Sequence, residues 1–213
     1  PDAAELVERV GAEAWAEGCG SVPVAAFTIT KLAWLVRQRP DLVPRATRVL
    51  LPHDYLTYRL TGTAATDRGD ASGTGYWDPS VGAYRKDLLA IVDAERSWDD
   101  VLPTVLGPME SAGRWHGAIV APGSGDNMAA ALGVGLRPGD TMMSVGTSGT
   151  VSAVSATPTA DPSGAVAGFA DATGRVLPLV CTSNAAKVLD AIRTLLGVDH
   201  ETFDRLALDA AAG

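Results

Sequence analysis

The sequence predicts an α/β fold, and three segments carry that prediction. At 47–62 a short β-branched apolar run is followed directly by a helical pattern. At 117–136 a second apolar run leads through a glycine-rich turn into small, helix-forming residues, and 140–155 indicates two strands joined by a tight turn. Because strands and helices alternate along the chain, we expect an α/β architecture.

The composition indicates which class of molecule the protein can bind. The chain has 213 residues, 46% hydrophobic and 20% charged. No apolar run reaches the roughly 18 to 20 residues that a membrane span needs. The net charge of -8 argues against a nucleic-acid or acidic-lipid surface, which would need basic patches. We therefore expect a small-molecule partner, no nucleic acid and no membrane.

The N-terminal segment and the two cysteines indicate a cytoplasmic protein. Residues 1–15 carry acidic side chains where a secretory signal would be basic, and they contain no apolar core. Cys19 and Cys181 have no metal-ligand spacing and no matching histidine cluster. We expect reduced thiols that serve in packing.

In the first half of the chain, hydrophobic spacing predicts helices at 2–16, 28–40 and 53–62. The last of these ends at Gly62, where a left-handed residue would close the helix. Between the second and third helices, the apolar run at 47–52 predicts a buried strand.

The middle of the chain is richer in turns. Residues 63–84 predict a loop with a short helix and a turn at 78–82, and a helix follows at 84–93. The Pro and Gly density of 102–115 is typical of a linker. We place a division between Gly113 and Gly117, which gives domains of 1–115 and 116–213.

The second half is expected to start with a strand that enters a glycine turn at 117–127, followed by a helix at 128–136. The two strands at 140–155 come next. Two helices at 184–212, separated near 197–200, end the pattern.

The turn between the two strands is a candidate phosphate site. Gly146 and Gly149 can adopt positive φ, so that backbone amides converge on one point, and Thr147 and Ser148 add hydroxyl donors. The turn lacks the lysine and the spacing of a P-loop. An ordinary glycine hairpin is the alternative interpretation.

Asp126 follows Gly123 and Gly125 in a short loop and directly precedes a helix-forming run. One interpretation is an N-cap, which contributes ~1 kcal/mol. A carboxylate at a helix N-terminus, reached by a loop that lets a ligand come close, can also accept a proton from a substrate hydroxyl. We expect this loop and the phosphate turn to follow neighbouring strands, which is the arrangement that phosphoryl transfer to a sugar or polyol needs.

Other chemistries are less well supported. His53, His116 and His200 stand in unrelated contexts, and no serine or cysteine lies in an activating sequence. Three aspartates gather in one stretch, but the pattern lacks the ligands of a calcium loop. We interpret them as helix caps and turn-formers: Asp67, Asp70 and Asp78.

Five segments occur in an order and at spacings that resemble the FGGY carbohydrate kinases. They are KLAWL (31–35), LLPHDYLTYRLTG (50–62), TDRGDASGTGYWD (66–78), GSGDNMAAALGVG (123–135) and SVGTSGTV (144–151). The resemblance covers nearly the whole chain from about residue 20, and it is greatest to the bacterial kinases of D-xylulose.

The resemblance implies an actin-like ATPase fold, with two ribonuclease H-like domains, each incomplete in this chain, facing across a cleft that binds ATP and Mg2+. It implies transfer of the ATP γ-phosphate to a ketose hydroxyl, with D-xylulose to D-xylulose 5-phosphate as the first expectation. Asp126 would then be the general base and Asn127 a neighbouring sugar contact. The ATP phosphate turn would comprise Gly146, Thr147, Ser148 and Gly149, and no metal ligand is assigned in this chain.

The resemblance also has gaps. The family's first phosphate motif, its adenosine site and an upstream sugar-contacting segment are not found, so we expect an internal fragment that is inactive alone. Kinases of glycerol, ribulose or gluconate stay open as alternatives, because few polar side chains separate such substrates. A non-catalytic sugar-binding relative is another alternative, although the base and the turn look intact. A homodimer is one expected assembly.

Overall fold

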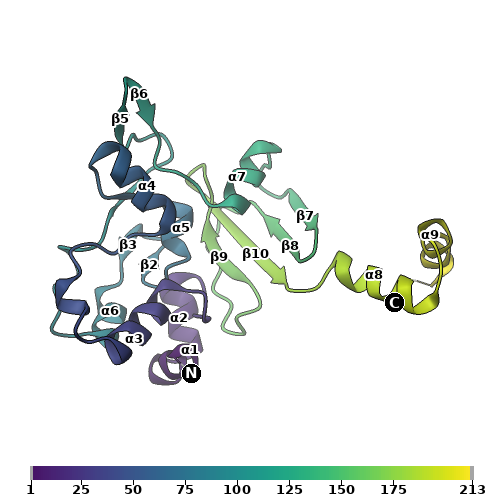
Figure 1. The fold of residues 1–213 in the computed structure, drawn as a ribbon, viewed down its shortest axis with the longest axis horizontal. Coiled ribbons are helices and arrows are strands. Elements are labelled where there is room, and N and C mark those ends of the chain that lie inside the picture. Colours follow the sequence, from purple (N-terminus) through teal and green to yellow (C-terminus); the bar gives the residue numbers. More distant parts are fainter. Residues whose placement is uncertain (1, 212–213) are drawn as a thin grey trace.

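The first part of the chain is mostly helical (Figure 1). The computed structural model describes residues 2–211. The helices that open the chain are α1 (Asp2–Val10), α2 (Ala12–Cys19), α3 (Thr28–Gln38), a 3-10 turn (Val43–Arg45) and α4 (Pro52–Thr61). The prediction of one helix at 2–16 was wrong in its continuity, because Gly11 has a φ of 92° and separates α1 from α2. Gly62 closes α4 in the left-handed conformation, as predicted.

The strand predicted at 47–52 does not form. These residues have no regular secondary structure up to the start of α4, and two of their amides have partners other than a strand. Val49 N donates to Val101 O at 2.8 Å, and Leu51 N donates to the Asp54 carboxylate at 2.9 Å. The prediction was wrong because the segment serves to start α4 rather than to pair with a strand.

Short strands occupy the region predicted as loop and linker. They are β1 (Ala65–Asp67), β2 (Trp77–Asp78), β3 (Ala83–Tyr84) and β4 (Thr104–Leu106), with α5 (Arg68–Ser72) and α6 (Lys86–Val92) between them. β1 pairs with β4 in parallel, and β2 pairs with β3 across the predicted turn. Asp78 forms that turn by accepting from Ser80 N at 2.8 Å, as expected of a turn-former.

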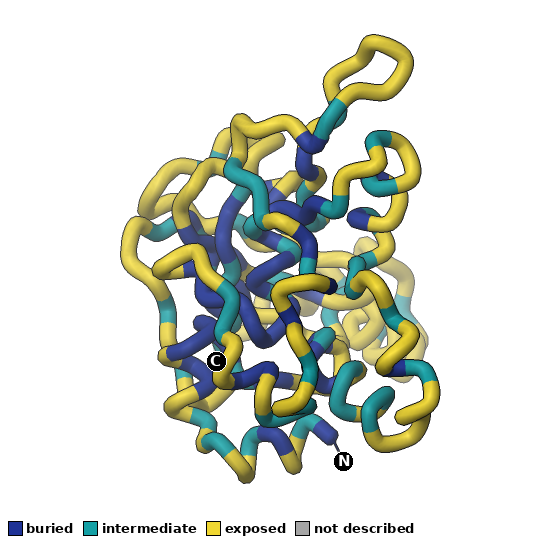
Figure 2. Tube along the Cα trace, turned by 90° about the vertical axis from the view of Figure 1, so that its left-hand side faces the viewer, coloured by how far each residue is buried: buried dark blue, intermediate teal, exposed yellow. Residues whose placement is uncertain are grey.

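A hairpin of β5 (Gly113–Trp115) and β6 (Ala118–Val120) lies where we placed the domain division. It projects from the top of the molecule in Figure 1, and Figure 2 shows it as largely exposed. The strand predicted after 117 is therefore present, but it pairs with the segment predicted as a linker. The domain bounds of 1–115 and 116–213 stay a prediction.

A four-stranded antiparallel sheet forms the second half. Its order is β7 (Thr141–Val145), β8 (Gly149–Ala153), β10 (Val176–Thr182) and β9 (Ala167–Ala170). The β7–β8 pair was predicted, whereas β9 and β10 were not. Helix α7 (Asp126–Gly133) packs on this sheet through a buried cluster of Met128, Ala131, Val154 and Leu177.

Strand β9 joins the two halves of the chain. Gly168 N donates to Gly20 O at 2.7 Å, and Ala170 N donates to Ser72 Oγ at 3.0 Å. The rings of Phe27 and Phe169 lie 6.5 Å apart at the same junction. Backbone and side-chain contacts thus fix the second half against the connector and α5 of the first.

The larger core lies within the helical part. Its buried members are Leu6, Trp15, Cys19, Phe27, Ile29, Tyr76, Leu88, Leu89, Trp98 and Val101. Burial of each large apolar side chain contributes about 1.5–3 kcal/mol. Trp15 is fully buried and donates its indole N–H to Leu6 O at 3.1 Å. Cys19 packs here as predicted, and burial raises its pKa to about 12, whereas Cys181 is exposed and its expected packing role was wrong.

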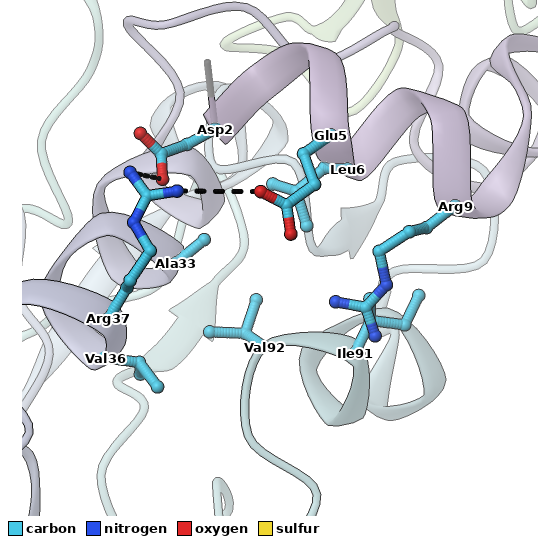
Figure 3. A pocket seen from close by; sticks show the side chains of 9 residues that line it. All are labelled: Asp2, Glu5, Leu6, Arg9, Ala33, Val36, Arg37, Ile91 and Val92. Carbon is cyan, nitrogen blue, oxygen red and sulfur yellow. Dashed lines mark ion pairs between the residues drawn. The ribbon is translucent and has the colours of Figure 1, made fainter.

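A pocket of about 220 Å³ lies among α1, α3 and α6 (Figure 3). Arg37 lies at one side of it, with one guanidinium nitrogen 2.7 Å from Asp2 Oδ1 and the other 3.5 Å from Glu5 Oε2. These ion pairs tie α3 to α1. The pocket is lined by none of the residues that we assigned to chemistry.

The last two helices are α8 (Ala186–Leu196) and α9 (His200–Asp209), as predicted; the predicted end at Ala212 lies outside the described residues. They extend away from the rest of the molecule in Figure 1, and neither contains a buried residue. Across residues 2–211, every helix is too short or too polar to cross a membrane.

Candidate functional site

Asp126 is the first residue of α7, and the N-cap is Gly125. The N-cap interpretation of Asp126 was therefore wrong by one position. Its Oδ1 accepts from Asn127 N at 2.7 Å and from Asn127 Nδ2 at 3.0 Å. A negative charge in the first turn also suits the helix dipole. Asp126 is exposed, so Asn127 orients a carboxylate that a ligand can reach.

Two other helix N-termini supply carboxylates. Asp54 is the third residue of α4, and its Oδ2 accepts from Leu51 N at 2.9 Å. Asp67 caps α5, and its Oδ2 accepts from Gly69 N at 2.8 Å and Asp70 N at 3.2 Å. The expectation that Asp67 is a helix cap is confirmed. Both carboxylates satisfy amides that a helix start leaves without partners.

His53 lies between these helix starts. Its Nδ1 is 2.9 Å from Asp54 Oδ1, and its Nε2 is 2.9 Å from Asp67 Oδ1 and 3.3 Å from Asp70 Oδ2. The imidazole thus bridges α4 to the β1–α5 junction. The expectation that Asp70 serves only as a cap or turn-former was wrong, because its carboxylate belongs to this cluster.

The pKa values in the cluster follow from its charges and burial. Contact with Asp54, supported by Asp70 and Asp67, raises the pKa of His53 although partial burial opposes it. Burial raises the pKa of Asp67 and of Asp70. The Asp126 charge is one of the smaller effects that raise the pKa of Asp70, so Asp126 lies within electrostatic reach of the cluster.

His53, Asp67 and Asp70 are the described residues that could surround a metal ion, since one ligand atom of each lies within 4.8 Å of the others. They already contact one another at hydrogen-bonding distance. Mg2+ prefers six oxygen ligands in octahedral geometry, which this set with its imidazole nitrogen does not match. We interpret the cluster as an ionic network, with a hydrogen bond between His53 and Asp67, rather than as a magnesium site.

The predicted phosphate turn lies between β7 and β8, with Gly146, Thr147 and Ser148 exposed. Neither Gly146 nor Gly149 has a positive φ, so the expected convergence of amides through left-handed glycines was wrong. Gly146 N instead donates to Ser148 O at 2.9 Å within the turn. Gly149 packs closely against the start of α8, since a Cβ there would lie 3.1 Å from Thr182 and 3.2 Å from Ala185.

The start of α8 is bonded to this turn. Ala185 N donates to Thr147 O at 3.0 Å, and Ala186 N donates to Gly146 O at 2.8 Å. The carbonyls of the turn therefore point toward α8. The exposed amides and hydroxyls of Thr147 and Ser148 stay accessible to an anion.

We expected Asp126 and the turn to follow neighbouring strands, and this expectation was wrong. Strand β6, which precedes the Asp126 loop, pairs with β5 in the hairpin, whereas the turn belongs to the four-stranded sheet. They are related instead through α7, which starts at Asp126 and packs on that sheet.

Sequence reasoning missed His53 and Asp54 and assigned only local roles to Asp67 and Asp70. A histidine in the first turn of a helix, followed directly by an acid, was a visible signal, because carboxylates belong there and an imidazole is less usual. The proximity of His53 and Asp54 to Asp67 and Asp70 depends on how α4 packs against β1, and the sequence does not reveal it.

Comparisons with known proteins give a consistent result. The model of the FGGY family of carbohydrate kinases, N-terminal domain, matches residues 3–133. A xylulose kinase of Streptomyces coelicolor is 50% identical over 96% of this chain and 44% of its own length. One of Haemophilus influenzae is 34% identical over 98% of this chain and 45% of its own length. The chain spans less than half the length of these curated relatives.

Solved structures agree with the sequence comparisons. A xylulose kinase of Bifidobacterium adolescentis superposes with a TM-score of 0.90 at 39% identity, covering 99% of this chain and 51% of that one. A Plasmodium falciparum glycerol kinase with ADP superposes at 0.81 with 15% identity, covering 95% of this chain and 44% of that one, which shows the fold alone. The fold is the actin-like ATPase fold, as predicted. The chain belongs to the FGGY family of carbohydrate kinases.

Proposed function

We propose that the protein bearing this chain is an ATP-dependent kinase that converts D-xylulose to D-xylulose 5-phosphate. The observation that carries the proposal is the 50% identity, over nearly the whole chain, to a protein named xylulose kinase. The oriented, exposed carboxylate of Asp126 at the start of α7 supports it on chemical grounds.

Asp126 would act as the general base. Asn127 occupies Oδ1, which leaves Oδ2 to accept the proton of the sugar hydroxyl. The hydroxyl oxygen then forms a bond to the γ-phosphorus of ATP while the bond from that phosphorus to the bridging oxygen breaks, and ADP leaves with the electron pair. Phosphoryl transfer needs chiefly alignment and charge stabilisation, and a carboxylate held by its neighbour supplies the alignment.

The turn at Gly146, Thr147, Ser148 and Gly149 would hold the ATP phosphates. Thr147 and Ser148 are exposed and offer amide and hydroxyl donors, while Gly149 keeps the turn close to the start of α8. Anion binding by such donors needs no lysine. We propose Asn127 as the neighbouring sugar contact.

Kinases of this family use ATP with a divalent metal, and we propose Mg2+. The network around His53 does not fit that ion, and we propose no metal ligand in this chain. We further propose that the protein works in the cytoplasm, on a sugar and ATP rather than on nucleic acid. The homodimer and the domain bounds of 1–115 and 116–213 stay predictions.

The test measures ADP release over a panel of ketoses and polyols that includes D-xylulose, ribulose, glycerol and gluconate. It uses the protein of the complete reading frame as wild type, as Asp126→Asn and as Asp204→Asn. Asp204 is exposed on α9, and this variant removes a similar charge at a distance from the site. We expect D-xylulose to be turned over fastest, and Asp126→Asn to lower kcat roughly 10²- to 10⁴-fold.

The outcomes separate substrate from mechanism. Full activity of Asp126→Asn would contradict its role as the base, and turnover of another sugar alone would contradict D-xylulose as the substrate. The absence of turnover on the whole panel would favour the non-catalytic alternative. Asp204→Asn should behave as wild type in every assay.

A further inference from the structure

The carboxylates around His53 divide their oxygens between two tasks. The oxygens of Asp54 and Asp67 that accept helix amides are both Oδ2, and those that face the imidazole are both Oδ1. The two helices are therefore capped without help from His53. Because capping does not require the imidazole, its three carboxylate contacts call for another explanation.

The cluster lies directly against the loop that leads to Asp126. A Cβ on Gly123 would lie 2.8 Å from His53 Cδ2 and Nε2, and one on Gly125 would lie 2.7 Å from Asp70 Oδ1. Asp70 thus faces His53 with Oδ2 and the loop with Oδ1. Two glycines on either side of Ser124 let the network approach the backbone more closely than any side chain would allow.

We propose that His53 is a positioning residue for Asp126. Acting through Asp70, it fixes the loop at Gly123–Gly125 and so sets the direction of the carboxylate that starts α7. The proposal rests on the proposed function, in which Asp126 is the base.

The charges around His53 explain how it acts. Carboxylates face it from each element packed against it: Asp54 on α4, Asp67 on β1 and Asp70 on α5, with Asp126 on α7 beyond. The nearby cation Arg68 is turned away, with its guanidinium 5.2 Å from the Trp77 ring and bonded to Pro79 O. Among the described residues, His53 is therefore the member of this network that can carry a positive charge.

Loss of the imidazole proton would leave Asp70 uncompensated beside Asp126. The two carboxylates then repel each other, because the Asp126 charge acts on Asp70, and Asp70 is partly buried and so less screened than a group in water. The loop between them contains Gly123 and Gly125, whose backbone has little to resist that repulsion. Protonated His53 thus holds the base in place, and deprotonation releases it.

The first experiment follows the loop by NMR in the protein of the complete reading frame. Backbone amide shifts of Gly123, Gly125 and Asp126 are recorded against pH together with the imidazole signals of His53. We expect the loop amides to titrate with the His53 imidazole in wild type and to lose that step in His53→Gln. His200→Gln, on the exposed helix α9, is the matched control and should keep the step.

The second experiment measures kcat and KM against pH in the protein of the complete reading frame. We expect His53→Gln and Asp70→Asn to lower kcat roughly ten- to a hundredfold, with a smaller change in KM for the sugar, because a displaced base affects the reaction more than binding. In wild type we expect kcat to fall as pH rises through the folded pKa of His53. His53→Lys keeps a cation, so it should recover much of kcat and should lack this alkaline fall.

The two experiments separate the inference from the proposed function. If wild type phosphorylates no sugar, the proposed function fails, and the positioning of a base fails with it. If Asp126→Asn is inactive while folded His53→Gln and Asp70→Asn keep the wild-type kcat and pH profile, only the inference fails. Loop amides that ignore the His53 titration would also overturn it.

Discussion

The space that neighbouring atoms leave decides which side chain a position can carry, and Gly123 is a clear case. Its φ is 103°, which side-chain-bearing residues rarely adopt, and the space for a Cβ is taken by the His53 ring. Gly117 has a similar φ of 86°, but no atom lies within 4 Å of the position of its Cβ. A side chain at either position would therefore strain the backbone, but only at Gly123 would its Cβ also collide with a neighbouring residue.

We expect Gly123→Ala to destabilise the chain more than Gly117→Ala. The strained backbone costs about 1–2 kcal/mol in either variant, and displacement of His53 adds roughly 1–3 kcal/mol at Gly123. Urea unfolding of both variants and wild type measures the difference. Equal losses of stability would show that the loop moves away from His53 without cost.

The candidate site shows which residue roles a sequence can reveal. Asp126 stood out because a carboxylate between glycines and a helix start is a local pattern. His53 did not, because its meaning comes from α4 packing against β1 and α5. The turn was found by its glycines, yet their conformation differs from the expected one, because the β7–β8 ladder closes the turn with ordinary φ values.

At the scale of elements, the long helices were predictable and the short strands were not. Helices α3, α4, α6, α8 and α9 carry their own hydrophobic spacing, and left-handed glycines end α4 and α8. Strands β1 and β4 have three residues each and are defined by pairing with a distant segment, as Ala65 does with Thr104. The run at 47–52 has the composition of a strand, but its amides serve other acceptors.

Helix α9 allows the effect of an N-cap to be tested in a helix that has no buried residue. Asp199 is its N-cap and accepts from Thr202 N at 2.9 Å, and these bonds lower the pKa of Asp199. No residue of α9 is buried, so the cap is a large share of what holds the helix start. We expect Asp199→Ala to speed hydrogen exchange of the Thr202 and Phe203 amides.

The effect of the cap should depend on pH with a definite sign. Because the folded pKa of Asp199 is lowered, its contribution is present above the unfolded pKa and is lost as pH falls through the folded pKa. Wild type and Asp199→Ala should therefore converge in acid. Asp204→Ala, an exposed mid-helix change, should not slow or speed exchange at Thr202, and a difference that persists in acid would argue against the cap.

At the scale of the whole molecule, the two halves of the chain meet at β9, where Ala170 is buried against Ala71 and Trp77. The backbone bond between Gly168 and Gly20 and the pairing of Ala170 with Ser72 join the β9 edge to the first half. Sequence gave no sign of this junction, since β9 was not predicted and each partner lies far away along the chain. The network around His53 is a second junction, because it brings α4 and α5 against the loop at Gly123 and Gly125.

This second junction should make the stability of the chain depend on pH. The folded pKa of His53 is raised, so the folded state holds a proton that the unfolded state releases above its ordinary value near 6.5. Its stabilisation is then complete below that value and is lost as pH rises through the folded pKa. Asp67 and Asp70 act in the same direction at lower pH, because their raised pKa values mean that ionisation in the folded state is unfavourable. Urea unfolding between pH 6 and 9 measures this dependence. The free energy of unfolding should fall with pH in wild type and in His200→Gln, whereas in His53→Gln it should start lower and stay level. A parallel fall in all three proteins would place the titrating group elsewhere.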